Sequence, residues 1–133
     1  MNYSLRHIQR ILKDVKDSNL SVPAGFWEHS PQWVRRHYNG IGADWMPRFV
    51  RAWVTKILNK LEAPSLVHDI EYLDTDKTYW KFTKANFRLW RNAIKKKRLL
   101  IGGFCALLCQ LFGWSAYRDG KESMAYYYYY REK

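Results

Sequence analysis

Residues 64–73, PSLVHDIEYL, have the pattern of a short buried helix. Proline suits the first turn of a helix, and four aliphatic residues follow it at the three- and four-residue spacing of one helical face. These are Leu66, Val67, Ile70 and Leu73. His68, Asp69 and Tyr72 would project from the same helix. Because it would carry an imidazole, a carboxylate and a phenol together, this segment is the first candidate for chemistry.

The residues before this segment also have helical periodicity. Residues 4–17 have the apolar and basic pattern of an amphipathic helix, and residues 47–61 have the most regular helical pattern of the chain. Between them, Pro31 indicates the start of a further helical turn. Taken with the segments that follow, these patterns predict an all-α fold.

The residues after the segment predict one long helix and one apolar stretch. The helix is expected to begin near Thr78 or Thr83 and to run into the basic residues 95–98. Residues 99–117 carry no charge, and nineteen such residues approach the roughly 20 that span a bilayer. We favour a core helix here, with insertion into a membrane or a position along its surface as the alternative. The residues that weaken a membrane span are Gly102, Gly103, Gln110, Gly113, Trp114 and Ser115.

The composition is that of one folded domain with a basic surface. With 133 residues, 47% of them hydrophobic, the chain can bury one core, and we expect about four or five of its seven tryptophans to lie there. Its 23 Lys and Arg against 12 Asp and Glu give a formal net charge of +11, which favours polyanionic partners. We expect residues 1–133 to form a single domain, with an N-terminal helix in residues 1–20 and a tyrosine-rich tail in residues 118–133.

A glycine-rich loop, Tyr38-Asn39-Gly40-Ile41-Gly42, precedes the His68 helix in the sequence. Glycines allow successive carbonyls to turn toward one point, and carbonyls with one carboxylate, here Asp69, suit a hard cation such as Ca2+. A neighbouring imidazole with a pKa near neutrality could take a proton from water that attacks an ester carbonyl polarised by this ion. His68 is the candidate base. The structural alternatives are a buried core histidine and an ordinary turn.

The pairing of this loop with the HDxxY sequence of residues 68–72 resembles the calcium loop and catalytic helix of phospholipase A2 enzymes. The resemblance implies a small phospholipase A2-like helical domain. It implies that Tyr38, Gly40 and Gly42 give main-chain oxygens to Ca2+ beside the carboxylate. It also implies that the Gly40 amide helps to hold the oxyanion and that Tyr72 braces the site through a hydrogen bond.

The resemblance extends toward viral members of the family, in which an aromatic segment and a helix with an orienting aspartate follow the His-Asp helix. Residues 79–86, YWKFTKAN, look like that segment, but Asn86 stands at the aspartate position. An asparagine can accept a hydrogen bond from His68, yet it supplies no negative charge to stabilise an imidazolium. Asn86 therefore joins the predicted catalytic set, and weak or lost activity is the alternative interpretation.

Small bacteriophage proteins also resemble this chain, in the loop, the His-Asp helix and a Leu-Phe-Gly-aromatic stretch within residues 111–117. The resemblance covers roughly residues 37–117 and favours a bacteriophage origin. One departure is the spacing between Gly42 and His68, which is longer than in compact family members because the 47–61 helix intervenes.

Cysteines and the N-terminus bear on location. Cys105 and Cys109 are four residues apart in an expected helix, so their Cβ atoms would lie about 5–6 Å apart, whereas a disulfide needs about 3.5–4.5 Å. Free thiols are typical of a reducing compartment or a virion, and basic residues interrupt the N-terminal apolar pattern, unlike a signal peptide. We expect a protein of the host cytoplasm or the virion, with membrane association as an option, and not a secreted one.

Three functions remain open. The first is a calcium-dependent phospholipase A2-like esterase acting at anionic membranes. The second is a catalytically impaired relative that serves as a binding or structural module for a virion or host protein. Residues 126–130 are five consecutive tyrosines that cannot all face one core, so some would face a partner, a membrane or solvent. The third is a nucleic-acid-binding basic protein, supported by charge and interleaved aromatic residues alone.

Overall fold

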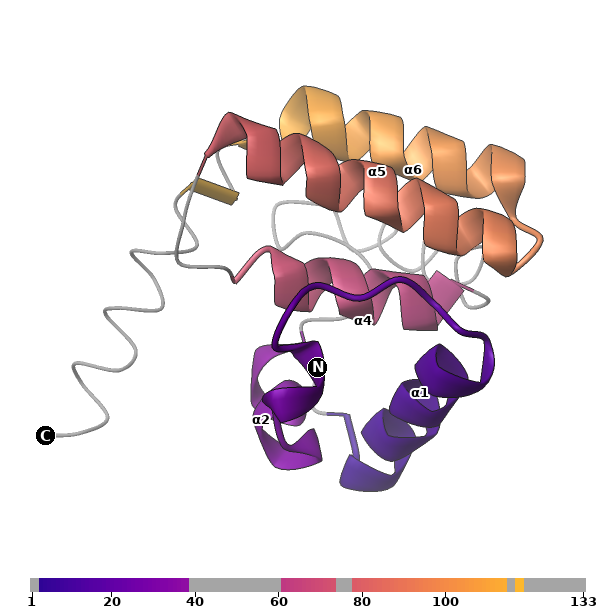
Figure 1. The fold of residues 1–133 in the computed structure, drawn as a ribbon, viewed down its shortest axis with the longest axis vertical. Coiled ribbons are helices and arrows are strands. Elements are labelled where there is room, and N and C mark those ends of the chain that lie inside the picture. The colour runs from indigo at the N-terminus through magenta and orange to yellow at the C-terminus, as the bar shows by residue number, and fades with distance from the viewer. Residues whose placement is uncertain (1–2, 39–60, 74–77, 115–116, 119–133) are drawn as a thin grey trace, which may run out of the picture.

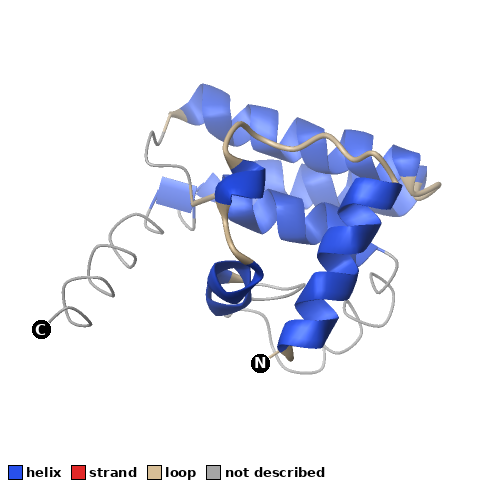
Figure 2. Cartoon of the chain, turned by 60° about the horizontal axis from the view of Figure 1, so that its bottom comes forward, coloured by secondary structure: helices blue, strands red, loops and turns tan. Residues whose placement is uncertain are grey.

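The computed structural model describes residues 3–38, 61–73, 78–114 and 117–118, and regular structure within them is entirely helical (Figures 1 and 2). The elements are α1 (Leu5–Asp17), the 3-10 helix η1 (Phe26–Glu28), α2 (Pro31–His37), α4 (Glu62–Glu71), α5 (Tyr79–Lys95) and α6 (Leu99–Phe112). The all-α prediction is therefore confirmed for this part of the chain. Nearly all of the predicted 47–61 helix, both glycines of the loop, and the five consecutive tyrosines lie outside the described residues.

Three helices begin at side chains that cap them. The hydroxyl oxygens of Ser4, Ser30 and Thr78 each accept a hydrogen bond from the backbone N–H three residues further on, at 3.1 to 3.2 Å. These caps satisfy N–H groups that have no partner inside the helix. Helix α4 differs, because it begins two residues before Pro64 rather than at it, and Pro64 occupies the first turn, where its missing N–H costs nothing.

Helix α4 is the central element of the described structure. Figure 1 shows α5 and α6 side by side on one side of α4, and α1 and α2 on the other. Because both sides are covered, α4 buries most of its ten residues, namely Ala63, Pro64, Leu66, Val67, His68 and Ile70. Ile8, Ile11 and Val15 of α1 and Val34 of α2 complete the core on its lower side. This position carries His68 into the interior.

Helix α6 lies on the surface, so the expectation of a core helix in residues 99–117 is wrong for these fourteen residues. It packs one face against α5 and exposes the other, with Leu100 85% and Phe104 61% exposed. Among the described helices, none is both long and apolar enough to cross a membrane. Cys105 and Cys109 are free thiols, as predicted, and burial raises the pKa of Cys109 to about 12.

The tryptophans are also less buried than expected. Trp27 and Trp80 are 53% and 68% exposed, and the other three in the described part of the chain are only partly buried. Only two of the seven lie elsewhere, so the expectation of four or five core tryptophans is wrong. Smaller aromatic rings fill the interior instead, namely Phe26, Tyr38, Phe82 and Tyr117.

The close approach of α5 to α6 gives a test of the packing. A Cβ added to Gly102 would lie 2.1 Å from the Ala93 Cβ, far inside van der Waals contact. Helix propensity favours alanine over glycine by about 1 kcal/mol, but overpacking costs about 1–3 kcal/mol. We therefore expect Gly102→Ala to lower the free energy of unfolding, measured in urea, and Ala93→Gly to restore part of the loss. The control is Gly103→Ala, whose Cβ would lie 3.2 Å from a movable Trp90 side chain. A Gly102→Ala protein more stable than the wild type would contradict the packing.

Candidate active site

His68 on α4 and Tyr72, the C-cap residue of that helix, lie one turn apart and face α5. The His68 side chain is buried, and its Nε2 lies 2.8 Å from the Oδ1 of Asn86. The Tyr72 hydroxyl donates a hydrogen bond to the same oxygen at 2.6 Å. The His68 and Tyr72 rings are 4.0 Å apart between centroids, as expected for residues four apart on a helix. One amide oxygen thus holds the imidazole and the phenol together.

Asn86 belongs to the buried face of α5 and is only 2% exposed. Its neighbours on this face, Phe82, Ala85 and Leu89, recur at the three- and four-residue spacing of one helical stripe and pull that face into the core. The Asn86 Nδ2 donates to the Oε1 of Gln110 on α6 at 2.9 Å. Every polar end of the Asn86 side chain is therefore used, which removes the cost of burying an amide.

The Gln110 side chain extends the hydrogen-bond network to the N-terminal end of α5. Its Nε2 lies 3.0 Å from the Tyr79 hydroxyl and 3.1 Å from the Thr83 hydroxyl. These hydrogen bonds connect α4, α5 and α6, beginning at His68 and ending at the hydroxyls of Tyr79 and Thr83. Rings pack around it, with Phe82 in contact with Tyr72, Tyr79, Trp114 and Tyr117.

The surroundings keep the imidazole neutral. Burial lowers the pKa of His68 to about 4, and the hydrogen bond to Asn86 acts in the opposite direction without offsetting it. A carboxylate at position 86 would oppose the effect of burial more strongly, because it would attract the positive imidazolium. At neutral pH the site therefore presents an uncharged, buried histidine beside the Tyr72 ring.

Asp69 follows His68 on α4, and its charge acts on the phenols of Tyr38 and Tyr72. Burial raises the pKa of Tyr38, and the charge of the nearby Asp69 carboxylate raises it further. Tyr38 ends α2 as its C-cap residue and is 2% exposed. Asp69 thus acts electrostatically on the residue at which the predicted calcium loop begins, while Gly40 and Gly42 lie outside the described residues.

The described donors are compatible with the predicted hard cation. Within residues 3–38, 61–73, 78–114 and 117–118, no three His, Cys, Asp or Glu side chains gather into a metal-binding group. The predicted site does not need such a group, because it combines one carboxylate with main-chain oxygens. Of the predicted ligands, Asp69 and Tyr38 lie within the described residues.

Among the predicted site residues, the structure brings His68, Tyr72 and Asn86 together through hydrogen bonds, and the charge of Asp69 acts on both Tyr38 and Tyr72. The structure adds Gln110, Tyr79 and Thr83, to which the sequence analysis assigned no site role. The available signal was Gln110, the one amide in the apolar helix α6, since a polar group in such a position generally has a partner.

Comparison with protein-family models, curated proteins and solved structures gives no match for this chain. The assignment of a function therefore depends on the residues themselves.

Proposed function

We propose that this protein is a calcium-dependent, phospholipase A2-like ester hydrolase that acts at anionic membranes and is encoded by a bacteriophage. The observation that supports this proposal most directly is the position of the Asn86 Oδ1, which accepts a hydrogen bond from the Tyr72 hydroxyl and lies 2.8 Å from His68 Nε2. These are the positions that the sequence resemblance assigns to the base, its orienting partner and the bracing tyrosine. In the sequence, Asn86 is 18 residues from His68 and 14 residues from Tyr72.

His68 is the proposed general base. If its Nε2 carries the proton and donates to Asn86, its Nδ1 carries the lone pair that takes a proton from the attacking water. Asn86 and Tyr72 hold the ring in orientation, and the surrounding aromatic rings limit access of bulk water. Calcium bound by Asp69 and by main-chain oxygens of Tyr38, Gly40 and Gly42 would polarise the ester carbonyl. The direct test is fatty-acid release from anionic vesicles in the presence of calcium or a chelator.

The outer surface of α5 and α6 supports the membrane as partner. We call it the α5–α6 face, and its exposed apolar side chains are Trp80, Phe87, Ile94, Leu99, Leu100, Phe104, Leu107 and Leu111. Trp90 connects the two helices on this side, in ring contact with Phe87 and close to Gly103. Exposed cations, Lys84, Arg91 and Lys97, accompany the apolar residues, and residues 78–114 contain no Asp or Glu.

Apolar residues among exposed cations match the chemistry of an anionic bilayer, where acyl chains contact the apolar side chains and lipid headgroups pair with the charges. The face also lies beside the site, because Tyr79, 57% exposed, is bonded through Gln110 to Asn86. Binding through it would bring the site to the lipid.

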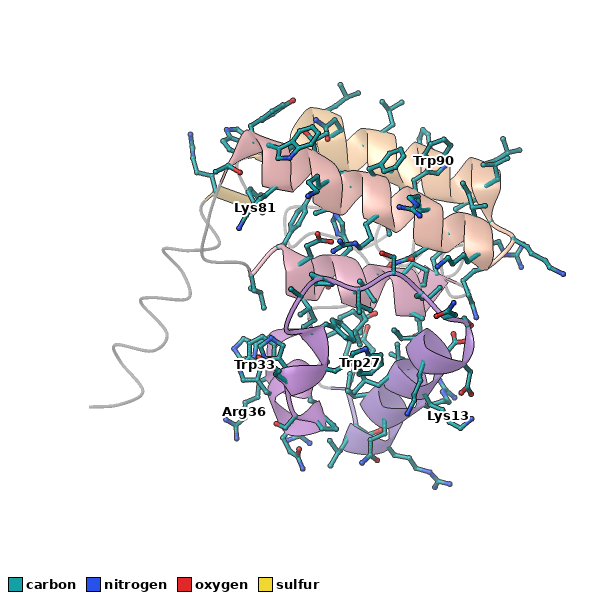
Figure 3. All side chains as sticks on the ribbon, viewed as in Figure 1. Lys13, Trp27, Trp33, Arg36, Lys81 and Trp90 are labelled. Carbon is teal, nitrogen blue, oxygen red and sulfur yellow. The ribbon has the colours of Figure 1, made fainter. Side chains whose placement is uncertain are left out.

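One introduced charge tests this face. Phe104→Glu would lose burial of a phenyl ring, about 1.5–3 kcal/mol, and would add a charge repelled by the lipid at about 1 kcal/mol. We expect a loss of affinity for anionic vesicles of about 30-fold or more, measured by vesicle co-sedimentation. Trp27→Glu is the control, because Trp27 is comparably exposed but lies on the α1–α2 side of α4, away from Trp90 (Figure 3). Equal binding by wild type and Phe104→Glu would contradict the proposed membrane face.

A second function is favoured by one observation, the asparagine at position 86. Without a carboxylate partner, His68 gains no charge that would stabilise its protonated form. A chain of this kind could keep the fold and use its basic, apolar surface to bind a virion or host protein. Absence of fatty-acid release from both the wild type and Asn86→Asp, with binding to such a partner retained, would support this function.

A further inference from the structure

Gln110 is a polar residue whose position is explained neither by core packing nor by the surface. It lies in a helix of otherwise apolar, glycine, alanine and cysteine residues, and it directs its side chain inward to Asn86. The Tyr79 and Thr83 hydroxyls hold the other end of its amide. The hydrogen bond with Asn86 is the one that links Gln110 to His68, the proposed general base.

An asparagine in an orienting position creates a problem that an aspartate does not have. The two oxygens of a carboxylate are equivalent, whereas an amide has an acceptor end and a donor end. If the Asn86 oxygen faces His68, the imidazole must carry its proton on Nε2. If the Asn86 nitrogen faces His68, Nε2 must be the acceptor and the proton moves to Nδ1, the position required for the base.

The hydrogen-bond network identifies the end that faces His68. The Asn86 Oδ1 accepts from the Tyr72 hydroxyl at 2.6 Å and lies 2.8 Å from His68 Nε2. The Asn86 Nδ2 points the other way, to Gln110, whose Oε1 accepts its hydrogen bond at 2.9 Å.

We propose that Gln110 is a positioning residue that sets the orientation of the Asn86 amide and thereby the tautomer of His68. By presenting an acceptor to the Asn86 nitrogen, Gln110 keeps the Asn86 oxygen on His68, the proton on Nε2 and the lone pair on Nδ1. The consequence for turnover rests on the proposed hydrolase function. The tautomer itself does not.

The primary test is therefore a measurement that requires no turnover. Nitrogen-15 NMR of histidine-labelled protein at neutral pH distinguishes the two tautomers of His68. The wild type and Gln110→Glu, which keeps an acceptor, are expected to show the Nε2–H tautomer. Gln110→Lys offers only donors, so Asn86 should turn its oxygen to Lys and its nitrogen to His68, and the Nδ1–H tautomer should predominate. Circular dichroism checks that each variant is folded. An Nε2–H tautomer in folded Gln110→Lys would overturn the proposal.

A second test uses vesicle hydrolysis in two backgrounds. Gln110→Lys should lower the rate of fatty-acid release about tenfold or more in the wild type, where it misplaces the lone pair. In the Asn86→Asp background the loss should shrink to less than about threefold, because a carboxylate offers His68 an oxygen in either orientation. Equal losses in both backgrounds would overturn the proposal. If no variant hydrolyses lipid while the tautomer follows position 110, the hydrolase function fails and the role of Gln110 in orienting Asn86 stands.

Discussion

His68→Gln is expected to lower calcium-dependent fatty-acid release from anionic vesicles by about 10²- to 10⁴-fold, the usual contribution of a general base. Glutamine has nearly the length of histidine and can donate to the Asn86 oxygen, so the hydrogen bond and the packing are largely kept. It has no nitrogen that can take a proton from water near neutral pH. The fold should therefore survive while the chemistry is lost. A chelator should produce a comparable loss in the wild type.

The matched control is His29→Gln. His29 stacks on Trp33 at a centroid distance of 3.8 Å, on the α1–α2 side of α4, and takes no part in the Asn86 network. Its replacement should leave the release rate within about twofold of the wild type, as for a surface substitution away from the chemistry. Hydrolysis that survives both His68→Gln and chelation would exclude the proposed mechanism.

Asn86→Asp is expected to increase activity. A carboxylate beside His68 would stabilise the imidazolium that forms as the base takes its proton, and Tyr72 would still donate to it. In a Ser-His-Asp triad the reverse change costs about 10⁴-fold in kcat, mainly through the wrong tautomer. Because the Asn86 oxygen already faces His68 here, only the charge is gained, and we expect an increase of about 10- to 100-fold.

The neighbourhood can accept this substitution. The carboxylate introduced by Asn86→Asp would place an oxygen against Gln110 Oε1, and because a carboxylate offers only acceptors, Gln110 would have to turn its nitrogen to that oxygen. This turn requires the Tyr79 and Thr83 hydroxyls to donate to Gln110 where they now accept from it, a reversal that nothing forces while position 86 is an asparagine.

The dependence of the rate on pH gives the second readout for Asn86→Asp. Burial holds the pKa of His68 at about 4, so the wild-type base stays unprotonated down to acidic pH. The carboxylate would raise that pKa, so the acidic limb of the rate profile should move to higher pH. An unchanged limb and an unchanged rate in a folded variant would contradict contact between the two side chains in solution.

Much of the local structure could be predicted from short-range signals. The serine and threonine caps and Pro31 place the starts of α1, α2 and α5, because a cap acts within one helical turn. The start of α4 was predicted two residues late, because a proline is tolerated throughout the first turn and does not by itself identify the first residue.

The error in α6 has a different cause. A long uncharged run fits a core helix, a membrane span and a surface helix with an apolar face equally well. Only the packing of α5 on one side of α6 decides that Leu100 and Phe104 face outward.

The candidate site likewise depends in part on the sequence alone and in part on the packing of the helices. The types of side chain at positions 68, 69, 72 and 86, and their helical spacing, follow from the sequence, since one turn of helix already puts His68 and Tyr72 on the same face. The contact of His68 with Asn86 and the reach of Gln110 to that amide required α4, α5 and α6 to pack together. Hydrogen bonds between helices depend on the relative placement of whole elements to within a fraction of an ångström, and no local pattern in the chain specifies that placement.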